Sequence, residues 1–325
     1  MKKKEIPNIN DFSLFLSEEI FKEPILSLYQ FKRGASSFNY LATLKNKKIL
    51  VKLAWKHKKE GVERLVNIIS TLSENNPFPI AKIIPLNNKF IFKYKNSYGF
   101  LLEYVDAKSL PATKIKQHHI DEILTTYKIF QNTIWKDKSI LIPEYDFNLI
   151  QKNYLNNAQC MLKKNKRNFF YSFFIKKCCS SLEMIGSTPL FIDPSKKTII
   201  HGDFHHNNIL FKNNRLVSIL DFEDVGYGYT SEDLLRFIFC LLARQPLFSS
   251  SKKQLDAYLK CVTKEFNYSY NEWMVGLNSY TLQKMKKLFH QENKCSLETI
   301  KKMIQLLIFM KTYKNVEQTL KILTA

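Results

Sequence analysis

The chain has 325 residues, of which 45% are hydrophobic and 24% charged, and its formal net charge is +21. That length can bury the core of one large domain or of two lobes, and the composition excludes collagen-like, low-complexity and intrinsically disordered classes. No apolar run approaches the roughly 18 residues that a membrane-spanning helix needs, and the basic start at residues 1–4 lacks the apolar stretch of a signal peptide. We therefore expect a cytoplasmic protein, whose six cysteines have no metal-ligand spacing and stay reduced.

The positive charge comes almost entirely from lysine. Arginine occurs at six positions, so lysine supplies 50 minus 6, or 44, of the basic residues, and these are spread along the whole chain. Proteins that bind nucleic acid also use arginine for phosphate and base contacts. We therefore expect no nucleic-acid partner and attribute the charge to compositional bias, while an anionic substrate or a peripheral membrane contact stays open.

The first hundred residues read as a β-rich region. An apolar-periodic helix within residues 1–24 is followed by three strands at 25–31, 38–44 and 48–54. The link at residues 32–39 contains one glycine and the hydroxyls of Ser36 and Ser37, a composition that suits either phosphate binding or an ordinary hairpin turn.

Lys52 is unusual because it lies inside the apolar strand at residues 48–54. Burying an unpaired ammonium is costly, so Lys52 requires an anionic partner unless it snorkels at a sheet edge. The helix predicted over residues 58–73 follows directly and offers Glu60 and Glu63.

The chain changes character after residue 105. Residues 74–98 indicate turns and short strands, and residues 99–105 a buried strand that ends in a polar linker. From residue 112 the pattern is helical, with predicted helices at 120–135, 147–162 and 169–185.

The segment from Ile199 to Leu210 has an apolar lead-in and the polar loop His-Gly-Asp-Phe-His-His-Asn-Asn, and a β-rich run then ends at Asp221. Phosphoryl transfer of the kinase type needs a carboxylate that accepts the proton of the attacking hydroxyl, and an Asn and a second carboxylate that hold magnesium at the ATP phosphates. In this spacing they would be Asp203, Asn208 and Asp221. A short loop points the first two the same way, and a returning hairpin brings Asp221 beside them.

These residues resemble the aminoglycoside phosphotransferase and choline kinase group of small-molecule kinases, whose loop has the same His-Gly-Asp and Asn and whose next hairpin ends in an Asp-Phe-Glu-like segment. The resemblance covers most of the chain in element order and is motif-specific at residues 199–236. It implies an α+β, two-lobed protein-kinase-like fold, with a small β-rich N-lobe at residues 1–104 and a large helical C-lobe at residues 105–325. No Arg follows His201, as it would in a protein kinase, so we expect a small-molecule substrate.

The resemblance also implies roles in nucleotide binding. Lys52 would bind the phosphates and be held by a helix glutamate, for which we favour Glu63 over Glu60 because Glu63 lies well inside the helix. Ser36 and Ser37 would cover the phosphates. Backbone groups near Glu103 and Val105 would pair with adenine.

Three further residues would support the loop. The resemblance implies that Asp233 braces it, although a position in the first helical turn would explain that carboxylate equally well. His201 would orient the loop by hydrogen bonds. Glu223 would reach a second metal or steady the loop through its backbone.

The resulting hypothesis is a kinase that uses ATP, with GTP open, and Mg²⁺ to phosphorylate a hydroxyl of a sugar, an amino sugar or an amino alcohol such as choline. An aminoglycoside kinase is the alternative, ranked lower because the lysine-rich chain offers no further acidic cluster for a polycation. A non-catalytic pseudokinase, a basic nucleic-acid-binding protein and a zinc site made by His201, Asp203, His205 and His206 stay open. The sequence does not predict an oligomeric state.

Overall fold

A computed structural model describes most of the chain. Its described residues are 7–31, 37–55, 57–74, 78–86, 89–133, 135, 197–242, 252–289 and 313–324, with scattered positions between 152 and 183. The chain divides into two compact units, unit 1 with Met1–Leu110, Thr125–Leu141 and Asn207–Glu223, and unit 2 with Pro111–Leu124, Ile142–His206 and Asp224–Ala325. The lobe boundary between residues 104 and 105 stays a prediction.

Unit 1 is built on an antiparallel sheet. Its six strands are β1 (Ser27–Gln30), β2 (Ser37–Thr43), β3 (Lys48–Ala54), β4 (Ile83–Ile84), β5 (Phe92–Tyr94) and β6 (Ser97–Glu103). They lie in the order β1-β2-β3-β6-β4, and β5 also pairs with β6. The first three strands confirm the sequence prediction.

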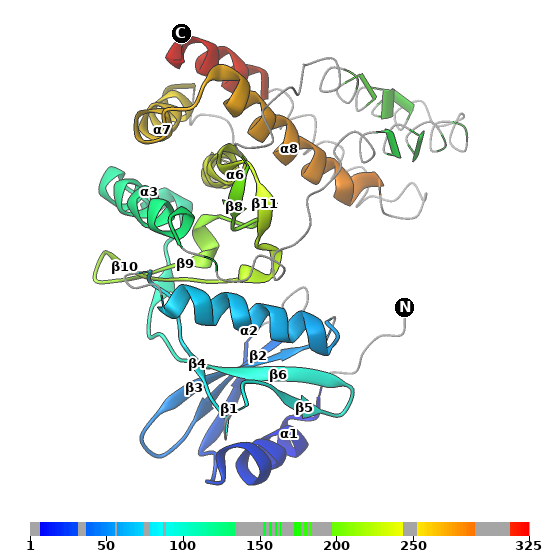
Figure 1. Ribbon diagram of the computed structural model, residues 1–325, viewed down its shortest axis with the longest axis vertical. Helices are drawn as coiled ribbons and strands as arrows, with labels where there is room; N and C mark the ends of the chain where they lie inside the picture. The colour runs from blue at the N-terminus through cyan, green and yellow to red at the C-terminus, as the bar shows by residue number, and fades with distance from the viewer. Residues whose placement is uncertain are drawn as a thin grey trace. The chain divides into compact units, whose positions relative to one another are not determined.

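Helices cover both faces of this sheet in Figure 1. On one face, α1 (Ile9–Phe15) and the π-helix η1 (Leu16–Phe21) bury Phe12 and Leu16 against alternate residues of β2 and β3 such as Tyr40 and Val51. On the other face lies α2 (Lys59–Glu74), which confirms the predicted helix within about one residue. Side chains alternate along a strand, so Lys52, next to Val51, projects toward the face that α2 covers.

A second sheet in unit 1 connects Asn208 to Asp221. It contains β7 (Lys108–Ser109), β9 (Ile209–Lys212) and β10 (Arg215–Ile219), in the order β10-β9-β7. Asn213 and Asn214 connect β9 to β10 with φ of 51° and 60°, the conformation of a tight hairpin turn that suits the right-handed twist of the strands. Short 3₁₀ turns, η5 (His206–Asn208) and η6 (Phe222–Asp224), flank this hairpin.

Unit 2 is mainly helical. Its elements are η2 (Ala112–Lys114), β8 (Thr198–Ile200), β11 (Gly226–Gly228), α6 (Thr230–Leu242), α7 (Lys252–Glu265) and α8 (Tyr270–Phe289). Helix α6 is buried over most of its length and packs against α7, α8 and β8. Strand β8 pairs with β11 and leads directly into His201.

Helix α3 (Gln117–Gln131) corresponds to the predicted helix at 120–135, and its residues divide between the two units. The predicted helices at 147–162 and 169–185 lie outside the described residues, apart from scattered positions.

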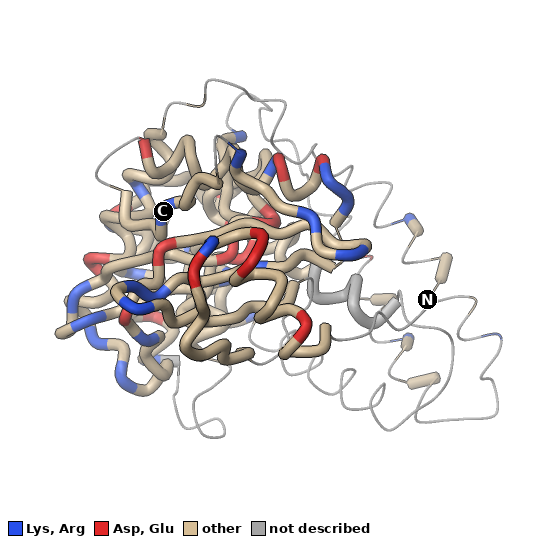
Figure 2. The backbone as a smooth tube through the Cα atoms, turned by 90° about the horizontal axis from the view of Figure 1, so that it is seen from below, with Lys and Arg blue, Asp and Glu red and all other residues tan. Residues whose placement is uncertain are grey.

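Lys and Arg occur on many separate segments of the described chain and are interspersed with Asp and Glu in Figure 2. This distribution agrees with a compositional origin of the charge. Within the described residues, no helix is long and apolar enough to cross a membrane. Four described cysteines, Cys160, Cys179, Cys240 and Cys261, are free thiols.

Candidate active site

The β9–β10 hairpin brings Asn208 and Asp221 together in unit 1. Ile209 pairs with Ile219, and the backbone N–H of Leu220 donates to the Asn208 carbonyl at 2.8 Å. Asn208 and Asp221 therefore stand at the same end of the hairpin, as their spacing predicts. Asp221 has a φ of 65°, a left-handed conformation that is uncommon outside glycine and that concentrates at functional sites.

The Lys52 side chain reaches this end of the hairpin. Its Nζ lies 2.7 Å from Glu223 Oε1 and 3.5 Å from Asp221 Oδ1. Burial would lower the pKa of Lys52, but the charges and hydrogen bonds of Asp221 and Glu223 outweigh burial and raise it. Lys52 is therefore a fixed positive charge in unit 1, and its partners are the two carboxylates of the Asp-Phe-Glu segment.

The predicted pairing of Lys52 with Glu63 is wrong in this structure. The Glu63 carboxylate instead lies 3.1 Å from Nζ of Lys59. Lys59 is one helical turn before Glu63, on an exposed part of α2. The physical reason is the rotation of the helix, because each residue turns by about 100° from its neighbour. Arg64 faces Glu223, and Glu63 consequently points away from it. Glu60 also lies in the exposed first turn of α2.

Glu223 has two further neighbours that sequence reasoning missed. His57 Nε2 lies 3.2 Å from Glu223 Oε2, and Arg64 Nη1 donates to the Glu223 backbone carbonyl at 3.0 Å. The prediction that Glu223 steadies its loop through its backbone therefore has a specific contact. A search for cations on α2, rather than for carboxylates alone, would have pointed to Arg64.

The other residues predicted to contact the nucleotide are Ser36, Ser37, Glu103 and Val105. Ser36 lies outside the described residues, and Ser37 is the buried first residue of β2. The Glu103 N–H donates to the Lys82 carbonyl at 2.9 Å, and the Val105 carbonyl accepts from the Ala107 N–H at 2.9 Å. These two backbone groups are engaged within unit 1, so adenine would have to use other groups of this segment.

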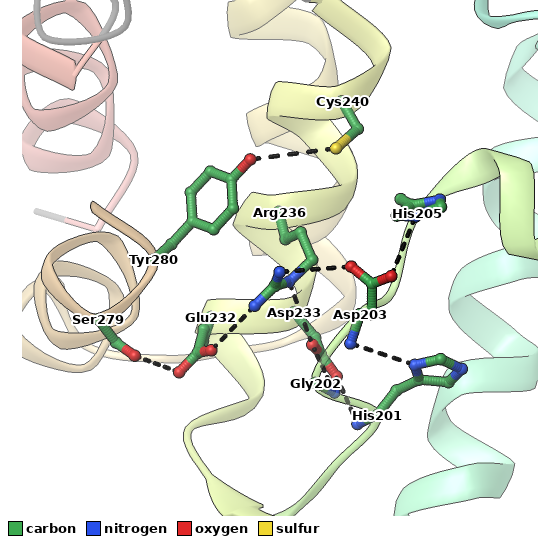
Figure 3. Close-up of polar contacts among 10 residues, drawn as sticks. All are labelled: His201, Gly202, Asp203, His205, Glu232, Asp233, Arg236, Cys240, Ser279 and Tyr280. Atoms are coloured by element: carbon green, nitrogen blue, oxygen red, sulfur yellow. Dashed lines mark hydrogen bonds and ion pairs between the residues drawn. The ribbon is translucent and has the colours of Figure 1, made fainter. Parts of the chain in front are cut away.

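Asp203 belongs to unit 2, where its two carboxylate oxygens contact different side chains (Figure 3). Oδ2 lies 3.2 Å from His205 Nε2, and Oδ1 lies 3.5 Å from Arg236 Nη1. Burial would raise the pKa of Asp203, but the hydrogen bond and charge of His205, with the charges of Arg236 and His201, lower it to about 2. Asp203 is thus a carboxylate, and not a carboxylic acid, at neutral pH.

The loop that carries Asp203 is held by Asp233. This carboxylate accepts from the backbone N–H of His201 at 2.6 Å and from that of Gly202 at 3.1 Å. His201 Nδ1 in turn accepts from the Asp203 N–H at 3.3 Å. Both contacts are of the kind expected for residues that brace and orient the loop.

Arg236 was missed in the sequence. Its guanidinium contacts Glu232 and Asp203 and lies near Asp233, and it packs on the ring of Tyr280 (Figure 3). A signal was present, because Arg236 interrupts the apolar run of α6 as Lys52 interrupts that of β3.

At the hairpin end in unit 1, Asn208, Asp221 and Glu223 offer oxygen atoms that could hold Mg²⁺. Carboxylate and amide oxygens are the ligands that Mg²⁺ prefers, and Asp221 and Glu223 already converge on a cation, the ammonium of Lys52. Within the described part of the chain, no group of three or more His, Cys, Asp or Glu side chains is arranged to hold a metal. The zinc alternative therefore gains no support from the geometry of those residues.

The segment that contains the Asp203 loop matches a known protein family. Residues 187–259 match the model of the phosphotransferase enzyme family, APH. The predicted resemblance to this group of phosphotransferases is confirmed. The predicted enzyme class, a phosphotransferase with an alcohol group as acceptor, is confirmed. No curated protein sequence matches the chain.

Solved structures of kinases share the fold. A spectinomycin phosphotransferase, APH(9)-Ia, in complex with ADP and spectinomycin is 16% identical, with a TM-score of 0.72 over 96% of this chain and 100% of that one. An aminoglycoside phosphotransferase from Alicyclobacillus acidocaldarius is 14% identical, with a TM-score of 0.66 over 98% and 97%. An amicoumacin kinase in complex with AMP-PNP is 13% identical, with a TM-score of 0.62 over 90% of each chain. The predicted α+β protein-kinase-like fold is confirmed.

Proposed function

We propose that this phosphotransferase moves the γ-phosphoryl group of ATP to a hydroxyl of a small molecule. The observation that carries the proposal is the convergence of Lys52, Asp221 and Glu223 at the end of the hairpin that also holds Asn208. A lysine, an Asn and a carboxylate are the groups that kinases use around nucleotide phosphates and their metal. Structural neighbours bound to ADP and AMP-PNP add support.

In this proposal the residues of unit 1 bind the nucleotide. Asn208 and Asp221 would hold Mg²⁺, which when bound neutralises charge on the phosphates. The Lys52 ammonium would exchange its carboxylate partners for phosphate oxygens, so nucleotide binding begins by separating an ion pair that is only 2.7 Å long at Glu223. The donors of Ser37 and of the Glu103 segment contribute to the nucleotide site, as the resemblance implies. Binding of GTP in place of ATP is one possible outcome of the thermal unfolding test of nucleotide binding.

Asp203 would act on the acceptor hydroxyl. With its pKa held at about 2, Asp203 is a weak base, and a general base is most efficient when its pKa lies near the working pH. Its main task is therefore to accept a hydrogen bond from the hydroxyl and aim the oxygen. The proton moves to the carboxylate late, once the transfer has made the hydroxyl acidic.

We propose two chemical classes for the acceptor molecule. The first is a sugar, amino sugar or amino alcohol, because the described residues near Asp203 use their carboxylates internally, on Arg236 and on backbone N–H groups. The second is an aminoglycoside or a related antibiotic. Structural neighbours in complex with spectinomycin and with amicoumacin favour it.

Nucleotide binding is tested by thermal unfolding with ADP and ATP, each with and without Mg²⁺. A ligand at 100 times its Kd stabilises the folded state by about 2.7 kcal/mol, so a clear rise in Tm that needs Mg²⁺ is expected. Asp221→Ala should weaken the rise, whereas Asp11→Ala, which removes an exposed carboxylate on α1, should not. No rise with either nucleotide or with GTP contradicts the proposal.

The acceptor is tested by ADP release across neutral sugars, amino sugars, choline, aminoglycosides and spectinomycin. Turnover with sugars or choline supports the first class, and turnover confined to the antibiotics supports the second. Nucleotide binding with no transfer to any acceptor or to water would instead identify a pseudokinase. Salt-sensitive binding to nucleic acid without nucleotide binding would identify a charge-driven binding protein.

A further inference from the structure

Arg236 is a charged residue inside an apolar helix. It lies in the middle of α6, where Leu234, Leu235 and Phe237 are at most 1% exposed, and it is itself only 9% exposed. A buried guanidinium must be compensated by anions and hydrogen bonds, since removing it from water costs several kcal/mol. The contacts of Arg236 therefore indicate which groups this part of α6 holds in place.

Three carboxylates surround this guanidinium (Figure 3). Arg236 Nη2 lies 3.2 Å from Glu232 Oε1, Nε lies 3.9 Å from Asp233 Oδ1, and Nη1 lies 3.5 Å from Asp203 Oδ1. The first two carboxylates come from the preceding turn of the same helix. The third comes from the loop after β8, so Arg236 is a bridge from α6 to Asp203.

Two of these carboxylates are fixed by other groups. The Ser279 hydroxyl of α8 donates to Glu232 Oε2, and Asp233 is held by the N–H groups of His201 and Gly202. The Tyr280 ring, also on α8, lies 5.2 Å from the guanidinium carbon and covers it. Arg236 is thus held by α8 and by its own helix before it meets Asp203.

Asp203 differs from the other two carboxylates, because its side chain is 34% exposed while those of Glu232 and Asp233 are at most 2% exposed. Its oxygens are held from different sides, Oδ1 by Arg236 and Oδ2 by His205. Rotating the carboxylate would break both contacts. One partly exposed carboxylate is therefore held in one orientation by a buried and rigid cation.

We propose that Arg236 is the positioning residue for Asp203, and that it aims this carboxylate at the acceptor hydroxyl in the phosphoryl transfer proposed above, on which this inference rests. Arginine suits the task because its planar fork meets Glu232 and Asp203 through different nitrogens at once. A lysine carries one point charge and can satisfy only part of this geometry. The Arg236 charge also contributes to the low pKa of Asp203.

The first experiment compares Arg236→Lys with the wild type in hydrolysis of MgATP, with water as the phosphoryl acceptor, and in calorimetric binding of MgADP. Arg236→Lys keeps the positive charge and loses the fork. Because a misplacement of about 1 Å can cost on the order of 100-fold in rate, we expect kcat to fall about 100-fold while the Kd of MgADP stays within about threefold. Arg215→Lys, at an exposed arginine of β10, is the matched control and should change neither value.

A double-mutant cycle separates positioning from a purely structural role. Residues that act as one unit have non-additive effects on rate. If Arg236 acts through Asp203, Arg236→Lys should lower kcat strongly in the wild type and little further in Asp203→Asn. An equal loss in both backgrounds, or an unchanged kcat in Arg236→Lys, would overturn the proposal.

Two further outcomes also decide the proposal. Should Arg236→Lys fail to fold, Ser279→Ala removes only the hydroxyl that anchors Glu232, and it should lower kcat with an unchanged Kd for MgADP; full activity in that variant rejects the proposal. A wild type that neither binds MgADP nor hydrolyses ATP rejects the proposed function and this inference together. A wild type that does both, beside an unaffected Arg236→Lys, rejects the inference alone.

Discussion

In unit 1 the ammonium of Lys52 lies between two carboxylates, whereas in unit 2 the guanidinium of Arg236 lies among three. The two partners of Lys52 differ in solvent exposure, because the Glu223 side chain is 13% exposed and that of Asp221 is 46% exposed. Two of the three partners of Arg236, Glu232 and Asp233, are almost fully buried and are held by hydrogen bonds from Ser279 and from the loop backbone. Both clusters place a cation in an apolar element, but in unit 1 His57 and Arg64 hold Glu223 while the Asp221 side chain stays half-exposed.

This difference suggests a division of labour. In the proposed function a nucleotide would replace the contacts of Lys52, so an ion pair that is exposed on one side suits a ligand site. An acceptor hydroxyl needs a carboxylate that does not move, so a braced network suits catalysis, where preorganised groups lose no energy to reorganisation. We therefore expect changes in unit 1 to act mainly on nucleotide affinity and changes in unit 2 to act mainly on turnover.

The largest expected effect is that of Asp203→Asn. The amide keeps the size of the side chain but cannot accept the proton of the hydroxyl, and a positioned acid or base contributes about 100- to 10,000-fold in rate. We expect kcat for MgATP hydrolysis to fall about 1,000-fold with an unchanged Kd for MgADP by calorimetry. Asp11→Asn, at the exposed Asp11 of α1, controls for loss of a carboxylate. Equal losses in kcat and affinity would break the division between the units.

The second effect concerns Gly202, which precedes Asp203. Its φ is 79°, and a Cβ here would overlap the backbone carbonyl oxygen of Asp224. Gly202→Ala combines a strained left-handed conformation with a backbone clash, and we expect it to lower the free energy of unfolding by about 3 kcal/mol in urea denaturation. Gly61→Ala is the control, because Gly61 lies within α2 without a positive φ and a Cβ there would lie 3.2 Å from His57 Cβ, a close contact that a small shift would relieve. A tolerated Gly202→Ala would show that the loop is less tightly braced than its contacts indicate.

These sites differ in how far the sequence predicts them. The pairing of Asn208 with Asp221 is local, because one tight hairpin sets it, and residue spacing is sufficient to predict it. The strands β1 to β3 and the helix α2 were predicted for a similar reason, since each has its own hydrophobic period.

Partners that depend on helix rotation or on distant segments were not predicted. The choice between Glu63 and Glu223 as the partner of Lys52 depends on how α2 is turned, which no local pattern fixes. Arg236 meets Asp203 across 33 positions of sequence, the difference between their residue numbers. Nevertheless, the rule that selected Lys52, a lone charge in an apolar element, applies equally to Arg236 and would have identified it as a site residue.

The third effect is on the stability of unit 1. Lys52→Met leaves the carboxylates of Asp221 and Glu223 close together without their cation. Removing one partner of a buried ion pair costs about 3–5 kcal/mol, and the exposure of Asp221 reduces the expected loss to about 2 kcal/mol in urea denaturation. Lys59→Met breaks the exposed pair with Glu63 and should leave stability unchanged within error. Equal effects of the two changes would mean that Lys52 gains as little from its carboxylates as a surface lysine does.

The smallest effect is the pH dependence that Asp203 contributes. Its pKa in the folded protein is about 2, and an Asp in an unfolded chain has a pKa of about 3.9. The folded state therefore binds protons less readily, and this contribution to stability is complete above about pH 5 and is lost as the pH falls toward 2. A shift of this size corresponds to about 2.6 kcal/mol, and exposure of one third of the side chain reduces the expected value to about 1 kcal/mol.

The measurement is the free energy of unfolding of the wild type minus that of Asp203→Asn between pH 6 and pH 3. A difference that shrinks as the solution becomes more acidic supports the ionised, braced carboxylate. A flat difference would mean that His205, His201 and Arg236 do not favour the charged form, and the contrast between the two clusters would then rest on geometry alone.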